Sequence, residues 1–302
     1  TRLKNQFDFC ISLYKYRRFL LHNEIFFVNS PPFIVGVFSS LYFSKYKNVI
    51  LNVSDLWPES LFDLGFFKKN LIVKESLYYL EKKIYRKASK IIAQSDESKE
   101  YIQEIVPNKD VFVYKNLEPN IPTESESLDI NTNIKMIYAG LLGHAQGIFE
   151  VVKKIKDFEN LNLDVYGQGI EFYIIDKFIK ENKVKNIKLH NVVSKKELQL
   201  ISSNYHFQIV ALKKPIKGAF PSKIYSSISQ GTPILYFGEG AVSSFIVKNN
   251  LGYAFDKIES FDESLISSKS LYREKKSHVF NYANMHCNFN QQIDKLSCFL
   301  EE

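Results

Sequence analysis

From residue 134 onward, short apolar runs alternate with segments of helical spacing, and this alternation constrains the fold more than any other feature of the sequence. Repeated β–α units of this length predict a parallel, doubly wound α/β sheet with helices on both faces. Ser194, with Glu197 three residues later, has the spacing of a helix capping box. The expected strands are 134–139, 161–166, 187–193, 205–212, 233–237 and 252–255, and the expected helices are 148–158, 171–182, 221–230 and 242–249.

The first part of the chain shows a similar but less regular pattern. Its expected strands are 24–28, 49–53, 90–93 and 111–114, and its expected helical stretches are 1–21, 32–46 and 67–88. The polar stretch 119–133 has no apolar periodicity, which predicts an interdomain linker. We therefore expect a first domain over 1–118, a second domain over 134–281 and a single amphipathic helix over 282–302.

The composition excludes several classes of protein. The 302 residues are 45% hydrophobic and 24% charged, which suits two globular domains and argues against a fibre or a disordered chain. Three scattered cysteines and six histidines without ligand spacing argue against a disulfide framework and a zinc site. The uncharged run 25–44 has Asn29, Ser30, Pro31 and Pro32 in its middle, so we expect a strand, a turn and a helix start there and no membrane span. Residues 1–10 lack the apolar core of a secretory signal.

The positive charge of the chain is concentrated near its beginning. The net charge is +7, and segment 64–90 alone holds eight basic and two acidic residues. A basic face flanked by aromatic residues favours docking on an anionic membrane surface. The alternative is a solvated helix face in a lysine-rich sequence. Nucleic acid is not an expected partner, because no recognisable nucleic-acid module accompanies the charge.

Two segments that follow expected strands could carry chemistry. The segment 52–60 contains Asp55, Glu59 and the only tryptophan of the chain, Trp57. Its two carboxylates could orient a hydroxyl group, or Asp55 could cap the next helix with Pro58 in its first turn. The glycine-rich segment 138–147 lies between a strand and a helix, where backbone N–H groups can approach a phosphate.

A third segment, 218–233, places a lysine at the start of an expected helix. Pro221 suits the first helical position, and Ser222 and Lys223 then lie in the first turn. The free N–H groups and the helix dipole favour an anion there, and the lysine adds a full positive charge. The alternative is an ordinary surface lysine. The sequence contains no D-x-D pair that could hold a metal–diphosphate.

Taken together, these segments resemble glycosyltransferase family 4 of the GT-B fold, in the branch that serves bacterial capsule, O-antigen and exopolysaccharide assembly. The matching motifs are S-P-P at 30–32, D-L-W-P-E-S at 55–60, Y-A-G-x-x-G-x-A-Q-G at 138–147, and P-S-K with G-x-P over 221–233. The resemblance implies two Rossmann-like domains facing a cleft. It also implies a retaining enzyme without a metal or other cofactor, which transfers a sugar from a nucleoside diphosphate sugar to a lipid-linked saccharide acceptor. The expected location is the inner face of the bacterial membrane, as a peripheral cytoplasmic protein.

The resemblance also assigns roles to individual residues. Lys223, with Ser222, would neutralise the leaving diphosphate, which Gly143 would face. Asp55 and Glu59 would lie on the acceptor side, and the C-terminal helix would cross back to the first domain. The remaining donor-binding residues would be Gln146 beside the diphosphate, Gly167 and Val193 around the nucleoside, Gly218, Ala219 and Phe220 as backbone for the donor sugar, and Ser226.

The chain departs from the family pattern in three places. Gly218 and Ser226 stand where the wider family has two glutamates, and Gln146 stands at a lysine position; Lys213, Lys214 and Lys217 could compensate. The expected opening strand and glycine-rich loop are missing, so the N-terminal domain is expected to be incomplete, by truncation or because a partner chain supplies the rest. A non-catalytic GT-B scaffold or partner subunit of another glycosyltransferase is therefore the alternative function. A sugar-nucleotide epimerase is a third, for which no acid–base pair is seen.

Overall fold

The computed structural model describes residues 2–63, 71–117, 119 and 133–301, and the chain forms two compact units. Unit 1 contains Thr1–Lys115, Ile216–Phe220 and Gln292–Glu302, and unit 2 contains Asn116–Pro215 and Pro221–Gln291. The chain therefore passes from one unit to the other four times.

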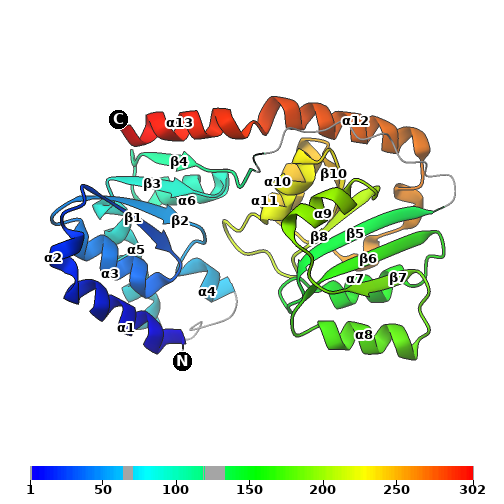
Figure 1. Cartoon of the computed structure of the whole chain (residues 1–302), viewed down its shortest axis with the longest axis horizontal. Helices are drawn as coiled ribbons and strands as arrows, with labels where there is room; N and C mark the ends of the chain where they lie inside the picture. Colours follow the sequence, from blue (N-terminus) through cyan, green and yellow to red (C-terminus); the bar gives the residue numbers. More distant parts are fainter. Residues whose placement is uncertain (1, 64–70, 118, 120–132, 302) are drawn as a thin grey trace. The chain divides into compact units, whose positions relative to one another are not determined.

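Unit 1 is built on a parallel sheet with the strand order β1-β2-β3-β4 (Figure 1). Val28 pairs with Leu51, and Leu51 pairs with Ile91, so apolar residues align across the sheet. The elements are α1 (Arg2–Lys15), α2 (Arg17–Leu20), β1 (Ile25–Ser30), α3 (Phe33–Phe43), β2 (Asn48–Val53), α4 (Glu59–Asp63), α5 (Leu71–Lys87), β3 (Lys90–Ala93), α6 (Asp96–Ile105) and β4 (Val111–Val113).

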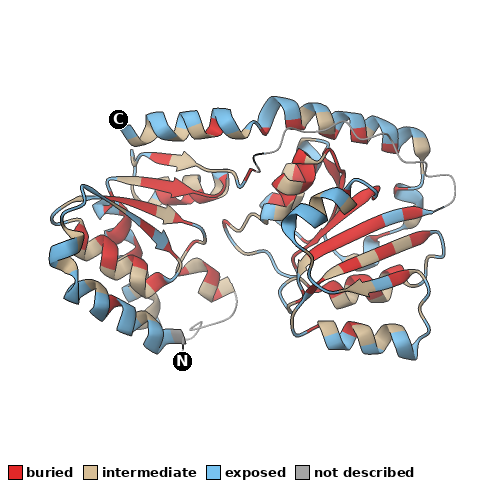
Figure 2. Ribbon diagram, in the orientation of Figure 1, coloured by how far each residue is buried: buried red, intermediate tan, exposed pale blue. Residues whose placement is uncertain are grey.

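The core of unit 1 lies between this sheet and its helices (Figure 2). Leu51 and Ile91 are fully buried in the central strands. Helix α3 covers one face of β1, where the rings of Phe26 and Phe43 stack with centroids 4.2 Å apart. The other face of β1 is open, because Ile25 and Phe27 are more than half exposed.

Unit 2 is built on a larger parallel sheet with the order β10-β9-β8-β5-β6-β7. The chain winds outward from β5 to β7 and then returns to β8 on the other side of β5, so the order reverses between β5 and β8. The elements are β5 (Ile134–Leu141), α7 (Ile148–Ile155), β6 (Leu161–Gln168), α8 (Phe172–Glu181), β7 (Ile187–His190), α9 (Lys195–Ser202), β8 (Phe207–Ala211), α10 (Ser222–Ser229), β9 (Ile234–Phe237), α11 (Ala241–Lys248), β10 (Gly252–Phe255), the 3-10 turns Ile258–Ser260 and Glu263–Leu265, and α12 (Lys269–His286).

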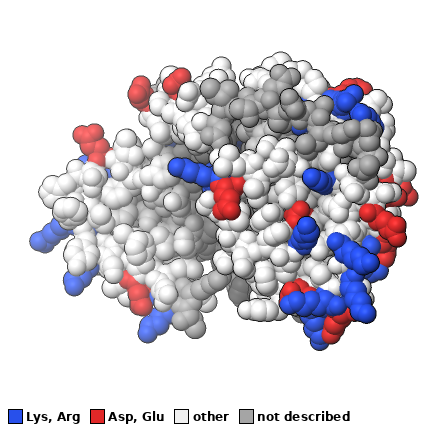
Figure 3. Space-filling model, turned by 45° about the vertical axis from the view of Figure 1, so that its right-hand side comes forward, with Lys and Arg blue, Asp and Glu red and all other residues white. Residues whose placement is uncertain are grey.

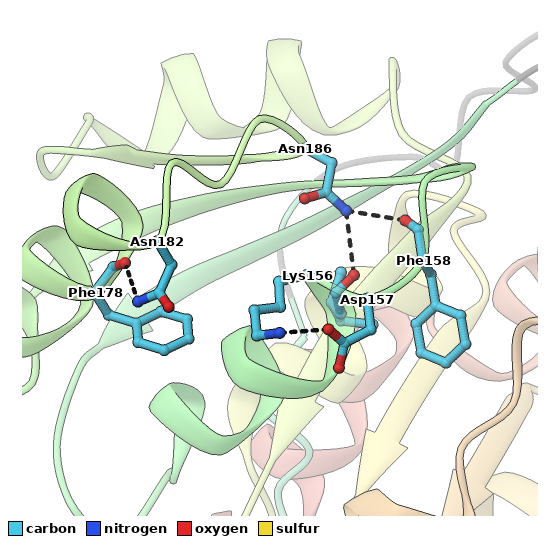
Figure 4. Close-up of polar contacts among 7 residues, drawn as sticks. Lys156, Asp157, Phe158, Phe178, Asn182 and Asn186 are labelled. Atoms are coloured by element: carbon cyan, nitrogen blue, oxygen red, sulfur yellow. Dashed lines mark hydrogen bonds and ion pairs between the residues drawn. The ribbon is translucent and has the colours of Figure 1, made fainter.

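Every residue of β8 and β9 is buried, as expected for central strands of a sheet covered on both faces. Near β7, at the edge of the sheet, asparagine side chains hydrogen-bond to backbone carbonyl groups of the neighbouring connections (Figure 4). The Asn186 side-chain amide donates to the carbonyl oxygens of Phe158 at 2.9 Å and Leu161 at 3.0 Å, and so ties the start of β7 to the start of β6. Asn182 closes α8 by donating to the Phe178 carbonyl at 2.9 Å.

The structure confirms the predicted α/β class with two parallel sheets, but one predicted element is wrong. The sequence predicts one helix over 282–302, whereas the structure has α12, which ends at His286, and α13 (Phe289–Glu301). Cys287 leaves the helical conformation at φ −117° and ψ 35°, and the Asn288 side chain accepts from the Gln291 N–H at 2.9 Å, which starts a new helix.

Residues 292–301 of α13 belong to unit 1. There, the amide of Gln292 exchanges two hydrogen bonds with the backbone of Lys115, at 3.0 and 2.7 Å. The expected linker 119–133 falls almost entirely outside the described residues.

Helix α5 carries most of the described part of the basic segment 64–90, and Lys90 begins β3; Lys68 and Lys69 lie outside the described residues. Lys82, Lys83, Arg86 and Lys87 are exposed on α5, whereas Glu81 is fully buried. On the face drawn in Figure 3, acidic and basic side chains are intermixed. Among the described helices, none combines the length and apolar character needed to cross a membrane.

Candidate functional site

A pocket of about 330 Å³ lies at the carboxyl ends of β5, β6 and β7 in unit 2. Ligands of doubly wound sheets bind at this edge, next to the point where the strand order reverses. The wall is mostly apolar, with backbone atoms at the strand ends. The lining residues are Ala139, Gly140, Leu141, Tyr166, Gly167, Gln168, Val192, Val193 and Leu198.

Two glycines set the shape of this pocket. A Cβ atom on Gly167 would lie 2.0 Å from the carbonyl oxygen of Gly140, so the two strand ends approach as closely as they do only because residue 167 has no side chain. Gly140 has φ +148°, and a Cβ atom there would lie 2.4 Å from both Cε and Nζ of Lys223. The end of β5 is therefore open for the lysine to reach.

Lys223 extends from the first turn of α10 to the edge of this pocket. Its Nζ lies against Gly140 and 5.1 Å from the ring centroid of Tyr138. The Tyr138 hydroxyl donates to the carbonyl oxygen of Leu141 at 2.6 Å, which fixes the ring. Burial lowers the pKa of the Lys223 ammonium group below its ordinary value.

None of the ion pairs found among the described residues involves Lys223. The first turn of α10 adds to the positive potential, because its N-cap residue Pro221 makes no side-chain cap hydrogen bond. A partly buried cation beside free helix N–H groups is an environment that an anion would stabilise.

The turn between β5 and α7 follows Gly140, the residue that Lys223 contacts. The N–H of Gln146 donates to the Gly143 carbonyl at 3.1 Å, and the buried Oε1 of Gln146 lies 2.9 Å from where a Cβ of residue 143 would stand. That Oε1 has no hydrogen-bond partner among the described residues. Lys213 packs its side-chain carbons beside Gly147, and its N–H donates to the Ala145 carbonyl at 2.8 Å.

A buried carboxylate occupies the N-terminal end of α7. Glu171 is 6% exposed, and its Oε2 accepts from the Phe149 N–H at 3.3 Å. Its Oε1 lies 3.6 Å from Nδ1 of the exposed His144. The start of α7 is therefore already held by a negative side chain, so the positive edge of the pocket is formed by α10 and Lys223.

Aromatic and polar side chains support the outer wall of the pocket. The ring of Tyr166 stacks on His190 with centroids 4.3 Å apart. Nε2 of His190 lies 2.5 Å from Oδ1 of Asp164, and the Tyr205 hydroxyl donates to the other oxygen of Asp164 at 3.0 Å. This arrangement gives a rigid aromatic surface at the end of β6.

In unit 1, carboxylates and hydroxyls hold the segment 216–220. The N–H of Gly218 donates to Oε2 of Glu97 at 2.8 Å. Its carbonyl accepts from the hydroxyls of Ser95 at 3.2 Å and Ser98 at 3.1 Å. The N–H of Lys217 donates to Asp63 at 3.0 Å. The main-chain groups of Gly218 are thus already engaged within unit 1.

The segment 55–63 leads to a pair of glutamates, of which Glu59 is half-buried and Glu81 is fully buried. Tyr78 donates to Oε1 of Glu59 at 2.9 Å, and Tyr101 donates to Oε2 of Glu81 at 3.0 Å and more weakly to Glu59 at 3.4 Å. The Tyr85 hydroxyl donates to the other oxygen of Glu81 at 3.0 Å. Burial, with a smaller contribution from the charge of Glu59, raises the pKa of Glu81 to about 8 despite these bonds.

Asp55 lies apart from this pair, half-buried, and burial raises its pKa. Helix α4 begins at Glu59. Asp55 lies four residues before the helix and is therefore not its cap residue, whereas Pro58 lies in the turn that leads into α4, where the Ser60 N–H donates to the Leu56 carbonyl at 2.8 Å.

Of the residues expected at the donor site, Gly167 and Val193 line the pocket and Lys223 reaches its edge. Gly143 and Gln146 form the neighbouring turn, and Ser222 and Ser226 lie on α10 with Lys223. Gly218, Ala219 and Phe220 belong to unit 1, as do Asp55 and Glu59.

Sequence reasoning missed Tyr138, Tyr166, Glu171 and the buried Glu81. Tyr138 and Tyr166 precede the glycines at the ends of β5 and β6 by one or two residues, which is a pattern that could have indicated them. No cluster of three or more His, Cys, Asp or Glu side chains able to hold a metal ion occurs among the residues described.

The sequence matches no protein-family model and no curated protein. The structure, in contrast, aligns with solved glycosyltransferases. Sucrose-phosphate synthase from Thermosynechococcus elongatus aligns with a TM-score of 0.73 at 12% identity, covering 99% of this chain and 77% of that one. HepE from Anabaena, solved with UDP and glucose, aligns with a TM-score of 0.72 at 13% identity, covering 96% and 81%.

The chain has the GT-B fold. The GtfA/B complex is a further neighbour, with a TM-score of 0.67 at 16% identity, and the match covers 96% of this chain but 60% of that chain. At these identities the likeness is one of fold, and the resemblance to glycosyltransferases of this fold agrees with the pocket at the carboxyl ends of β5, β6 and β7.

Proposed function

We propose that this protein is a retaining glycosyltransferase of family 4, which takes a sugar from a nucleoside diphosphate sugar and transfers it to a lipid-linked saccharide acceptor in surface polysaccharide biosynthesis. The observation that carries the proposal is the position of Lys223. Its ammonium group reaches Gly140 at the end of β5, beside a pocket of about 330 Å³, which is within the range of small-molecule sites.

The pocket suits the nucleoside part of such a donor. Its apolar wall and the ring of Tyr166 offer surfaces for a planar base, and the backbone at Gly167 and Val193 offers polar groups. The diphosphate would then extend along the strand ends toward Lys223 and the first turn of α10, with Gly143 and Gln146 on its other side. Lys213 follows β8 and adds a second positive charge near this turn.

The chemistry assigned to the protein is electrostatic. As the bond to the donor sugar breaks, negative charge grows on the diphosphate, and Lys223 with the N–H groups of α10 would stabilise it. The leaving diphosphate can itself accept the acceptor proton on the same face, so no protein nucleophile is required. In this proposal the lysine and helix take the role that a divalent metal has in other transferases, and turnover is expected to persist in a chelator.

The acceptor is proposed to lie near Asp55 and Glu59 of unit 1. Asp55 has a raised pKa and follows β2, at an edge where ligands of parallel sheets bind. Glu59 is already held by Tyr78, so its role is to keep this segment in place or to orient an acceptor hydroxyl. The exposed basic face of α5 supports association with an anionic membrane at which a lipid-linked acceptor would be found.

The test is calorimetric titration of the protein with UDP, GDP, ADP and dTDP, for the wild type, Lys223→Ala and a matched control. Lys248→Ala is that control, because Lys248 is an exposed lysine at the end of α11 in unit 2 and has no part in the proposed site. We expect one nucleotide to bind saturably, the control to bind equally well and Lys223→Ala to lose most of the affinity. With the matching donor sugar, Lys223→Ala should lower turnover about 100-fold or more, as loss of a preorganised charge does in other enzymes. Near-normal turnover of Lys223→Ala would refute the role of the lysine.

A second candidate function is a non-catalytic subunit that binds another glycosyltransferase. Two observations favour it: the GtfA/B complex among the structural neighbours, and Gly218 and Ser226 at positions where the wider family has glutamates. This function predicts that the chain alone binds no nucleoside diphosphate and forms a stable complex with a second transferase. The same titration therefore separates the two candidates.

A further inference from the structure

Four side chains of unit 2 form a closed set of contacts next to the donor pocket. Both oxygens of Asp164 are occupied: Oδ1 lies 2.5 Å from Nε2 of His190, and Oδ2 accepts from the Tyr205 hydroxyl at 3.0 Å. The hydroxyls of Tyr205 and Tyr166 share a further hydrogen bond. The rings of His190 and Tyr166 stack, with centroids 4.3 Å apart and an angle of 9° between their planes. The contacts therefore begin and end at Tyr166.

The protons available to these groups fix the direction of each hydrogen bond. A tyrosine hydroxyl has one proton, and that of Tyr205 goes to Asp164, so the bond between the two hydroxyls is one that Tyr166 donates. A carboxylate only accepts, so Nε2 of His190 carries the proton that it gives to Asp164. Every donor in the set thus has an acceptor, and Asp164 is the group on which two of the three hydrogen bonds converge.

The register of the sheet brings these residues together. Tyr166 and His190 are paired neighbours on β6 and β7, and Asp164 precedes Tyr166 by two residues, on the same face of the sheet. Tyr205, only 9% exposed, reaches them from the turn before β8, and the side chains of His190 and Asp164 are 34% and 22% exposed. A polar network largely removed from water is costly unless its members are paired, and a fully paired one holds its side chains in a single arrangement.

Tyr166 is the member of this set that lines the pocket. His190 covers one face of its ring and Tyr205 engages its hydroxyl, so the other face and the edge of the ring are what it can offer to a ligand. The remaining lining residues are aliphatic or glycine, apart from Gln168. Every nucleobase has a flat face that can stack on an aromatic ring. A ring that is already fixed loses little conformational freedom when a base stacks on it.

We propose that Asp164, His190 and Tyr205 are positioning residues, which hold the Tyr166 ring as the stacking surface for the nucleobase of the donor. The inference rests on the proposed function, because it requires that the base occupies this pocket. Asp164 is the central residue. It lies outside the wall of the pocket as the structure describes it, and it acts through His190 and Tyr205. Its removal should therefore weaken the binding of the base and leave the binding of the diphosphate unchanged.

The test separates the two ends of the ligand. Its probes are inorganic pyrophosphate and whichever of UDP, GDP, ADP and dTDP binds to the wild type, each titrated by calorimetry. For Tyr166→Leu we expect the Kd of the nucleoside diphosphate to rise at least about fivefold, the lower end of what base–aromatic stacking contributes, and the Kd of pyrophosphate to change by less than about twofold. Tyr253→Leu is the matched control, since Tyr253 is a half-buried tyrosine on the edge strand β10, and it should change neither Kd.

A pair of variants tests the role of Asp164. Asp164→Asn can keep the set intact, because its amide oxygen accepts from Tyr205 and its amide nitrogen donates to Nε2 of the other His190 tautomer. Asp164→Ala leaves both partners without an acceptor. We expect Asp164→Asn to bind the nucleoside diphosphate about as well as the wild type, and Asp164→Ala to raise its Kd at least about threefold without affecting pyrophosphate. A carboxylate with a merely structural role would change both probes together or neither.

Saturation-transfer NMR on the wild type needs no variant and decides the matter even if the variants fail to fold. Irradiation of the aromatic protons of the protein should saturate the base protons of the bound nucleotide more strongly than its ribose protons, because the base would be in contact with Tyr166.

Stronger transfer to the ribose, or an unchanged nucleotide affinity of folded Tyr166→Leu, would overturn the inference while leaving the donor site in place. Equal nucleotide affinities of Asp164→Asn and Asp164→Ala would overturn the positioning role of Asp164. Binding of no nucleotide to the wild type is a different result, because it would refute the proposed donor site itself and this inference with it.

Discussion

The protonation of Glu81 should make the free energy of unfolding of unit 1 depend on pH. Glu81 is fully buried, and burial is the largest cause that raises its pKa from 4.5 to about 8. Between these pH values the folded protein keeps a proton that the unfolded chain releases. The contribution of Glu81 to the free energy of unfolding should therefore be greatest below about pH 4.5 and fall as the pH rises toward 8, by up to about 1.4 kcal/mol per pH unit.

The perturbation is Glu81→Gln, which keeps the shape of the side chain and removes its titration. The amide oxygen can still accept the hydrogen bond from Tyr85, and Tyr101 can turn its hydroxyl to accept from the amide nitrogen. We expect the variant to lose most of the pH dependence between about pH 5.5 and 7.5, so that wild type and variant differ in slope by up to about 1.4 kcal/mol per pH unit. All other titrating groups are common to both proteins and cancel in the difference.

The assay is urea unfolding at a series of pH values, followed by the fluorescence of Trp57, which reports on unit 1. Glu75→Gln, an exposed glutamate of the same helix, is the matched control and should keep the wild-type slope. Parallel pH profiles for wild type and Glu81→Gln would show that Glu81 is ionised in the folded protein, and the reasoning from its burial would be refuted.

Three further predictions concern the donor site and the membrane surface. Gly140→Ala places a Cβ 2.4 Å from Nζ of Lys223 and should weaken nucleotide binding at least about tenfold in calorimetry, so unchanged affinity would contradict the position of the lysine. Gly167→Ala brings a Cβ within 2.0 Å of a backbone oxygen and should destabilise unit 2 by about 2 kcal/mol or more, measured by chemical denaturation; wild-type stability would show that the strand ends can separate. Charge reversal on α5 should weaken binding to anionic vesicles at least about 100-fold, and so should high salt; binding that ignores both would exclude the basic face, which consists of Lys82, Lys83, Arg86 and Lys87.

The sheet of unit 2 could be predicted from the sequence because its central strands are apolar throughout. The expected strands 205–212 and 233–237 contain β8 and β9, whose residues are all buried. The expected strand 187–193 runs three residues past the end of β7. Val192 and Val193 are apolar for another reason, since they line the pocket, and periodicity cannot distinguish a strand residue from a pocket residue.

Helix α6 had no such signal, because most of its side chains are polar. It is anchored by Tyr101 and Ile102, which are buried, and it begins at Ser95, whose side chain accepts from the Ser98 N–H at 3.1 Å. Two acidic residues in the first turn, Asp96 and Glu97, were the available indication of a helix start.

Only those site residues that belong to a recognisable sequence motif or to a strand end could be predicted. The expectation of a lysine at a helix start located Lys223, and the strand ends located Gly167 and Val193. Glu81 could not be found in this way, because it lies among lysines in a segment that has the composition of a solvated helix face. Tyr85 is one helical turn away, but Tyr101 lies on another helix, and a contact between separate helices leaves no trace in local spacing.

The passage of residues 216–220 through unit 1 has a consequence for any attempt to cut this protein in two. A break between residues 115 and 116 would separate the chain at one of its four crossings only. The second fragment would still carry Gly218, whose partners Ser95, Ser98 and Glu97 remain in the first, and it would also carry Gln292, whose partner is Lys115. A nicked molecule should therefore stay together as a complex of two fragments, and two fragments produced separately should find each other, each completing the fold of the other.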